Sequence, residues 1–333
     1  MKGQGYLWTT RDAFLTVPGT GKRATTALAQ PRGHGGRGAI GTHGAAGNRE
    51  DTVAMHMAER VELAGWAELW AAAPTELAAR HGIASTELGG ALCTAVGEQE
   101  STMLNRVVGL GLDEPATEEQ LEEIEAFFAP HGQQYYVSLS PKAKPSDLPD
   151  RLARRGFGDG YAWMKFTRGP EEPPPAQTVL RVEEIGPERG ADFGEVVAAG
   201  YELEPFTAPW LAELPKTSWR CYVAYDGEEP AGAAALYVGP RGAGYLCFAA
   251  TRPEHRRKGA QSALLDRRIR DAAKAGCTEL FTETGERIPM KPSNSYRNIL
   301  RYGFAEAYLR PNYLSPEPGA GSTVTEARSA ASR

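Results

Sequence analysis

Residues 251–265 read Thr-Arg-Pro-Glu-His-Arg-Arg-Lys-Gly-Ala-Gln-Ser-Ala-Leu-Leu, and this stretch decides how we interpret the region around it. A strand pattern ends at Thr251, a basic turn at 256–258 follows, and helical spacing of apolar residues begins near Gly259. Small residues at a helix start let backbone N–H groups approach a ligand, and the positive end of the helix dipole favours an anion. The stretch therefore predicts a cradle for a diphosphate.

The sequence on both sides of this stretch predicts an α/β domain. We expect strands at 179–185, 219–225, 231–238, 245–251, 278–284 and 305–313, and helices at 191–200, 256–275 and 293–302. A strand–helix–strand unit that follows a meander places parallel and antiparallel pairs in one sheet.

Residues 169–177, which include the run Gly-Pro-Glu-Glu-Pro-Pro-Pro, form the clearest internal boundary and predict a stiff linker. The linker separates a first domain at 58–168 from a second at 178–315. The two domains end alike, because 152–157 and 299–304 each have a helical pattern that ends in Gly-Phe and precedes a strand pattern. This similarity predicts a duplicated fold.

The quoted stretch resembles motif A of the GNAT superfamily of N-acetyltransferases. Its signature is Gln or Arg, two further residues, Gly, one residue, and Gly or Ala. Arg256 and Gly259 match, whereas Gln261 stands where Gly or Ala is expected. The resemblance covers 178–315 and extends to 58–168 as a degenerate copy. It implies two tandem GNAT-like domains, each with a mixed, mostly antiparallel sheet flanked by helices.

In that family the backbone amides of this turn bind the pyrophosphate of coenzyme A, and the preceding strand pairs with the pantetheine arm. The resemblance therefore implies acetyl-CoA as co-substrate. The separated cysteines and histidines show no metal-binding spacing, so no metal is expected. The residues implied to bind acetyl-CoA are Ala249, Thr251, Arg256, Arg257, Lys258, Gly259, Ala260, Gln261, Ser262, Asn294 and Asn298. The long side chain of Gln261 could crowd the phosphate or donate a hydrogen bond to it.

The resemblance also implies that two strands splay apart around the thioester and that an amine attacks its carbonyl, with a backbone N–H near Ala249 stabilising the oxyanion. An alkyl amine with a pKa near ~10 is mostly protonated at neutral pH, so it must lose a proton first. Glu283, acting through water, is the candidate base, and Glu286 is a second candidate. The structural alternative is that Glu283 caps a loop or faces solvent.

The tyrosine that serves as acid in the family, four residues before the final Gly-Phe, is replaced by Ile299. We expect Tyr296, one helical turn earlier, to take its role. The alternative is that Tyr296 stacks on the cofactor or packs in the core.

The first domain has the opposite charge at the corresponding turn. A strand expected at 107–112 leads into a helix, and a further strand is expected at 135–139. Thr117 and Gln120 form a capping box. The acidic residues that would repel a diphosphate are Asp113, Glu114, Glu118 and Glu119. This copy is interpreted as scaffold or as a wall of the acceptor site.

Composition limits the remaining possibilities. Residues 1–50 hold seven Lys or Arg against two acidic residues and no sustained apolar pattern, so we expect 1–54 to be disordered, with Met55 or Met57 as the native start. Residues 316–333 are the expected disordered tail. The net charge of −5 argues against a nucleic-acid partner, and no apolar run is long enough for a membrane span. Four separated cysteines favour the reducing cytoplasm.

These observations predict a cytoplasmic enzyme that transfers an acyl group, acetyl first of all, from coenzyme A to a small-molecule or protein amine. The alternative is an acyl-CoA-binding sensor or interaction protein with weak turnover. The acceptor, the length of the acyl group and the oligomeric state stay open.

Overall fold

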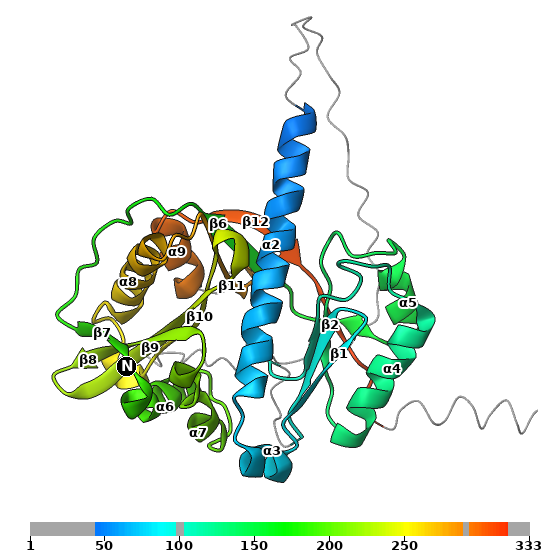
Figure 1. Cartoon of the computed structure of the whole chain (residues 1–333), viewed down its shortest axis with the longest axis horizontal. Helices are drawn as coiled ribbons and strands as arrows, with labels where there is room; N and C mark the ends of the chain where they lie inside the picture. Colours follow the sequence, from blue (N-terminus) through cyan, green and yellow to red (C-terminus); the bar gives the residue numbers. More distant parts are fainter. Residues whose placement is uncertain (1–43, 98–102, 289–292, 319–333) are drawn as a thin grey trace, which may run out of the picture.

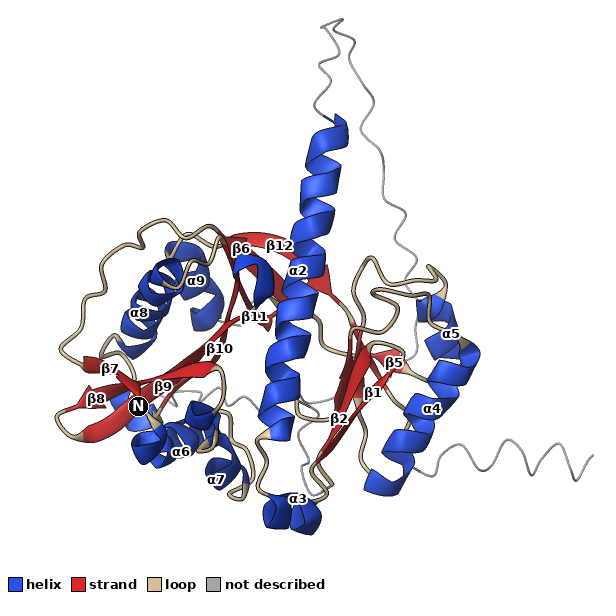
Figure 2. Cartoon of the chain, viewed as in Figure 1, coloured by secondary structure: helices blue, strands red, loops and turns tan. Residues whose placement is uncertain are grey.

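The computed structural model describes residues 44–97, 103–288 and 293–318. They form two β-sheets with helices packed on their faces (Figures 1 and 2). The predicted fold class is confirmed: each sheet is mixed and mostly antiparallel, and helices flank both.

The larger sheet has seven strands. Their order is β12 (Ala305–Arg310), β6 (Trp163–Arg168), β11 (Glu279–Gly285), β10 (Ala243–Thr251), β9 (Glu229–Val238), β8 (Trp219–Asp226) and β7 (Arg181–Ile185). The pair β10–β11 is parallel, and the other pairs are antiparallel.

The smaller sheet has six strands. Their order is β1 (Ala84–Leu88), β2 (Ala91–Ala95), β3 (Arg106–Val108), β4 (Tyr136–Ser138), β13 (Asn312–Leu314) and β5 (Gly158–Asp159). Here β3–β4 is the parallel pair.

The helices bury three apolar layers against these sheets. Their bounds are α2 (Gly44–Ala71), α3 (Thr75–His81), α4 (Glu118–Phe128), α5 (Leu148–Arg154), α6 (Gly190–Gly200), α7 (Thr207–Leu211), α8 (Ala260–Lys274) and α9 (Asn294–Arg301). Helices α8 and α9 share a core with one face of the seven-stranded sheet, and α2, α6 and α7 cover the other face. Helices α4 and α5 cover the six-stranded sheet, and α2 lies between the two sheets (Figure 1).

Within the described residues, five single 3₁₀ turns join these elements. They are Ala129–His131, Pro187–Arg189, Leu214–Lys216, Pro240–Gly242 and Pro253–His255.

The two sheets repeat one pattern and exchange one strand. In each, an antiparallel hairpin leads to a parallel pair joined by a helix, which is α4 between β3 and β4 and α8 between β10 and β11. However, β6 follows the first set of elements yet pairs with β11, and β13 follows the second set yet pairs with β4. Each sheet therefore contains a strand from the other side of the linker, so the linker is not the boundary between the two sheets.

Three expectations need correction. The disorder expected through residue 54 is wrong for 44–54, which belong to α2; once the packed part of a helix forms, each added residue gains a hydrogen bond. The strand expected at 305–313 is split, because Pro311 has no N–H to donate to a sheet. The helix expected from residue 256 begins at Ala260. The rest of the leader, 1–43, lies outside the described residues, as do residues 319–333 of the tail.

Candidate coenzyme A and acyl-transfer site

The cavity that contains the candidate residues opens where two parallel strands part. Strands β10 and β11 are paired only from Ala243–Glu279 to Leu246–Thr282. Beyond that point β10 stays with β9 and β11 stays with β6, so the strands diverge. The resulting cavity of about 1880 Å³ is lined by both strands, by α8 and α9, and by the end of the linker.

A β-bulge shapes the β10 wall of this cavity. The pairing of β10 with β9 jumps between Cys247 and Ala250, which removes Phe248 and Ala249 from the ladder. Phe248 has a φ of 53°, a left-handed conformation that costs a bulky side chain of order 1–3 kcal/mol. Strain of this kind concentrates at functional sites, and Ala249 lines the cavity beside it.

The start of α8 requires a glycine for backbone reasons. Gly259 is the N-cap residue with a φ of 88°, and no side chain caps the helix. A Cβ at Gly259 would lie 2.5 Å from the carbonyl oxygen of Gln177 in the linker. The Thr178 hydroxyl also donates to the Lys258 carbonyl at 2.7 Å. The linker therefore holds the turn, and the first N–H groups of α8 face the cavity without a side-chain partner.

The basic turn offers two guanidinium groups. Within the described part of the chain, Arg256 and Arg257 are exposed and make no ion pair. Lys258 instead contacts Asp226, which also accepts from His255 Nδ1 at 3.0 Å. The positive charge directed to a ligand thus comes mainly from the arginines and the helix dipole.

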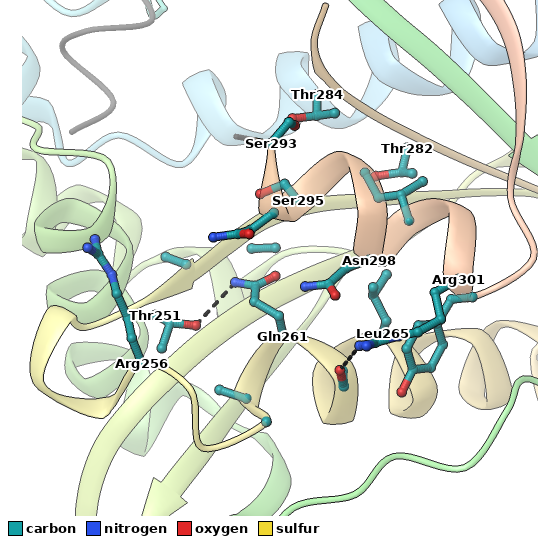
Figure 3. A pocket seen from close by; sticks show the side chains of 18 of the residues that line it. Thr251, Arg256, Gln261, Leu265, Thr282, Thr284, Ser293, Ser295, Asn298 and Arg301 are labelled. Atoms are coloured by element: carbon teal, nitrogen blue, oxygen red, sulfur yellow. Dashed lines mark hydrogen bonds between the residues drawn. The ribbon is translucent and has the colours of Figure 1, made fainter. Parts of the chain in front are cut away.

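The side chains of α8 and α9 approach one another across the cavity, as Figure 3 shows. Gln261 Nε2 donates to Thr251 Oγ1 at 3.2 Å, so its amide is directed to the end of β10. Arg301 Nη2 donates to Ser262 Oγ at 2.6 Å, and Asn298 points into the same space from α9. All eleven residues expected to bind coenzyme A line this one cavity.

Glu283 also lines the cavity, but its carboxylate is already occupied. Its side chain is 8% exposed, and its Oε2 lies 2.6 Å from Lys165 Nζ and 3.1 Å from Arg310 Nη2. The Tyr245 hydroxyl donates to the other oxygen at 3.0 Å. An amine or a water would have to compete with these groups. Glu286 lines the cavity too, and its Oε1 accepts the Ala162 N–H at 3.0 Å.

Behind Glu283 lies a buried ionic cluster that joins α2 to both β6 and β12. Arg310 is fully buried and contacts Glu59 at 3.0 Å and Glu62 at 2.6 Å, and Lys165 also contacts Glu62. Burial alone would raise the pKa of Glu62, but the charges of Arg310 and Lys165 outweigh it and hold the pKa well below its usual range. The members of the cluster are Glu59, Glu62, Arg106, Lys165, Glu283 and Arg310.

Tyr296 is directed away from the cavity. Its hydroxyl donates to Glu306 Oε1 at 2.5 Å, and its ring packs edge-on against Phe166. Burial and the hydrogen bond to Glu306 raise the pKa of Tyr296 to about 12. Three other tyrosines, Tyr161, Tyr201 and Tyr302, do line the cavity.

Among the cavity residues that sequence reasoning does not identify, Tyr201 and Arg268 are the most informative. Tyr201 follows α6, and only the packing of α6 beside β10 brings it to the site. Arg268 lies on α8 in the stripe that also contains the buried Leu264 and Ala272. An arginine at a core position is itself a signal, because charged side chains are rarely fully buried without a partner.

No group of metal-ligating side chains is found in the described ranges 44–97, 103–288 and 293–318. Over the same ranges, no helix combines the length and the apolar character that crossing a bilayer requires. All four cysteines have free thiols.

Among the similar solved structures, the first one below supports the fold. A GCN5-related N-acetyltransferase from Kribbella flavida has a TM-score of 0.52 at 16% identity, covering 74% of this chain and 94% of that protein. A GCN5-related N-acetyltransferase from Sphaerobacter thermophilus gives 0.47 at 15%, with 59% and 64% covered. A tandem GNAT protein from the clavulanic acid biosynthesis pathway gives 0.46 at 14%, with 61% and 70% covered.

Comparison with known sequences reaches part of the chain. None of the curated proteins matches this sequence significantly. The model of the acetyltransferase (GNAT) family matches residues 191–287, which run from α6 to just beyond β11 and include the bulge, the basic turn and α8. This region of the protein therefore belongs to the GNAT family of acetyltransferases.

Proposed function

We propose that the protein binds acetyl-CoA in the cavity between β10 and β11 and transfers the acetyl group to an amine. The observation that carries this proposal is the coincidence, in one cavity, of the diverging strands, the bulge at Phe248 and the uncapped start of α8. An uncapped helix start beside two arginines that make no ion pair with any described residue suits a diphosphate, and the separated strands leave backbone groups for a pantetheine arm.

In the proposed reaction the neutral amine attacks the thioester carbonyl. A C–N bond forms, the C–S bond breaks, the nitrogen gives up one further proton, and the leaving thiolate takes up a proton, so the products are the amide and free coenzyme A. The proton lost by the incoming ammonium passes to Glu283 or Glu286 through water. Because Lys165 and Arg310 hold Glu283, its role includes fixing this wall of the cavity.

The residue that protonates the thiolate is proposed to be a cavity tyrosine. The Tyr296 hydroxyl donates to Glu306, whereas the cavity is lined by Tyr161, Tyr201 and Tyr302. The orientation of Tyr296 and the apolar Ile299 also favour the second candidate function, a sensor that binds acyl-CoA with little turnover. Thiol release from acetyl-CoA over an amine panel separates the two, since a sensor releases none above the rate in buffer.

The cofactor assignment is tested by reversing a charge in the basic turn. Arg256→Glu should weaken acetyl-CoA binding at least tenfold in calorimetry, about 1.4 kcal/mol, with an unchanged melting temperature. Lys142→Glu is the matched control, because Lys142 is exposed and lies outside the cavity. Equal affinity in the two variants would reject the cradle. Gly259 is a poor position for this test, because any Cβ there strains the linker contact.

A further inference from the structure

Arg268 is the most unusual charge in the cavity. Its side chain is 1% exposed, and it emerges from α8 eight residues after the helix start, about 12 Å along the axis. Nε donates to the Leu264 carbonyl at 3.0 Å. Nη1 donates at 3.2 Å to the carbonyls of Ala235 on β9 and Cys247 on β10. The guanidinium therefore lies at the bulge, where the strands begin to part.

Within the described part of the chain, this buried cation has no counterion. Among the described residues no carboxylate lies within 4.0 Å of it. Burial lowers the pKa of Arg268 to about 10, so it remains charged at neutral pH. Burial also raises the pKa of the nearby Cys247 thiol to about 12 and that of the Tyr201 phenol above its usual range. These neighbours are thus neutral at neutral pH and do not compensate the charge.

The unused part of the guanidinium is accessible from the cavity. Arg268 lines it, and Nη2 makes no hydrogen bond to any described residue. Nη2 is also not fully enclosed by the protein, unlike buried atoms without a partner such as Arg310 Nε. The carboxylate on the facing wall, Glu283, is neutralised by Lys165 and Arg310. A ligand anion at Nη2 would therefore meet an uncompensated positive charge in a poorly hydrated place, where such a contact is strong.

We propose that Arg268 binds a carboxylate carried by one of the two substrates, at the inner end of the cavity. The inference rests on the proposed function, because the position of Arg268 beside the bulge places its partner next to the reacting thioester. The carboxylate belongs either to a dicarboxylic acyl group on coenzyme A or to the amine acceptor, as in an amino acid. Both sources supply the same chemistry at the guanidinium.

The acyl source is tested with two thioesters of equal carbon number. Calorimetry on the full chain compares succinyl-CoA with butyryl-CoA, which lacks the terminal carboxylate. If the acyl group supplies the anion, succinyl-CoA binds at least tenfold more tightly. Arg268→Gln should remove that preference and Arg268→Lys should keep part of it. The control Arg267→Gln, on the neighbouring side chain that contacts Asp271, should retain it.

The acceptor source is tested by turnover with acetyl-CoA, comparing L-amino acids with their primary amides. If the acceptor supplies the anion, KM is at least tenfold lower for the acids in the wild-type chain, and Arg268→Gln removes the difference. Because Arg268 also holds three carbonyls, its variants could fail to fold, and the comparisons on the wild-type chain then decide the question alone. Acetyl-CoA binding with no carboxylate preference in either test overturns this inference and leaves the proposed function standing. Absence of acetyl-CoA binding overturns both.

Discussion

The units β3–α4–β4 and β10–α8–β11 have the same topology, but a side chain caps the start of α4 and none caps the start of α8. In the first unit Thr117 caps α4 by accepting the Gln120 N–H at 3.2 Å, and Glu118 of the first turn is paired with Arg151 and Arg155. In the second unit α8 begins at a glycine with no side-chain cap. One helix start is closed by the chain itself, and the other is open to the cavity.

The loop before α4 is also closed, because it packs against the backbone of Lys144. A Cβ at Gly111 would lie 2.3 Å from the Lys144 carbonyl, the Lys144 N–H donates to the Gly111 carbonyl at 2.8 Å, and the Ala116 N–H donates to the Lys144 carbonyl at 2.8 Å. Asp113 is paired with Arg60 at 3.0 Å, so its charge is partly offset. In this copy the N–H groups before and at the start of α4 are already hydrogen-bonded within the chain. This difference from the copy with the cavity matters more than repulsion by the acidic side chains. The shared topology alone therefore does not produce an open helix start.

The largest effect is expected where the two copies are joined. Arg310→Met removes the partner of Glu59 and Glu62 in the ionic cluster, and breaking such a buried pair costs about 3–5 kcal/mol of unfolding free energy. Because β6 and β13 are exchanged between the sheets, denaturation should remain one transition. Arg297→Met, on an exposed side chain of α9, should cost less than about 0.5 kcal/mol. A loss below about 1 kcal/mol, or separate transitions for the two sheets, would show that the copies are independent.

The next effect concerns the number of binding sites. The double variant Arg256→Glu/Arg257→Glu should weaken acetyl-CoA binding at least 100-fold, about 2.7 kcal/mol, since both guanidinium charges beside the start of α8 are reversed. Titration of the wild-type chain should give one site per chain. The full chain is needed, because a fragment 58–168 would lack β13 from its own sheet. Residual binding of wild-type strength in the double variant would locate the site in the first copy.

The sequence predicts the second copy well because its information is local. The strand–turn–helix at 251–265 contains the turn, the glycine and the helix start within fifteen residues, and these positions do line the cavity. What the sequence does not reveal depends on long-range packing. Glu283 meets Arg310 through the pairing of β6 with both β11 and β12, and Arg268 is buried only once α8 covers the bulge. Tyr296 lies on the expected helix, but its orientation toward Glu306 is set by β12.

The third prediction concerns the residue that follows the last paired position of each parallel pair. This residue is Glu283 in the pair β10–β11 and Leu139 in the pair β3–β4. If Glu283 relays the proton, Glu283→Gln should lower kcat at least tenfold at neutral pH, and rising pH should partly restore it by deprotonating the amine directly. Glu286→Gln is the comparator. Unchanged kcat for Glu283→Gln across the pH range, with a loss for Glu286→Gln, would move the base to Glu286.

The smallest effect tests whether the closed helix start of the first copy is purely structural. Thr117→Ala removes the hydroxyl that accepts from Gln120 and should cost about 1 kcal/mol of unfolding free energy, as the loss of an N-cap does. Acetyl-CoA affinity should not change, because Thr117 lies outside the cavity. Ser293→Ala is the matched variant, since Ser293 caps α9 by accepting the Tyr296 N–H at 3.4 Å and also lines the cavity. It should lower stability by a similar or smaller amount and weaken acetyl-CoA binding as well. If Thr117→Ala weakened binding as much as Ser293→Ala, the start of α4 would be part of the site, and the contrast between the two copies would fail.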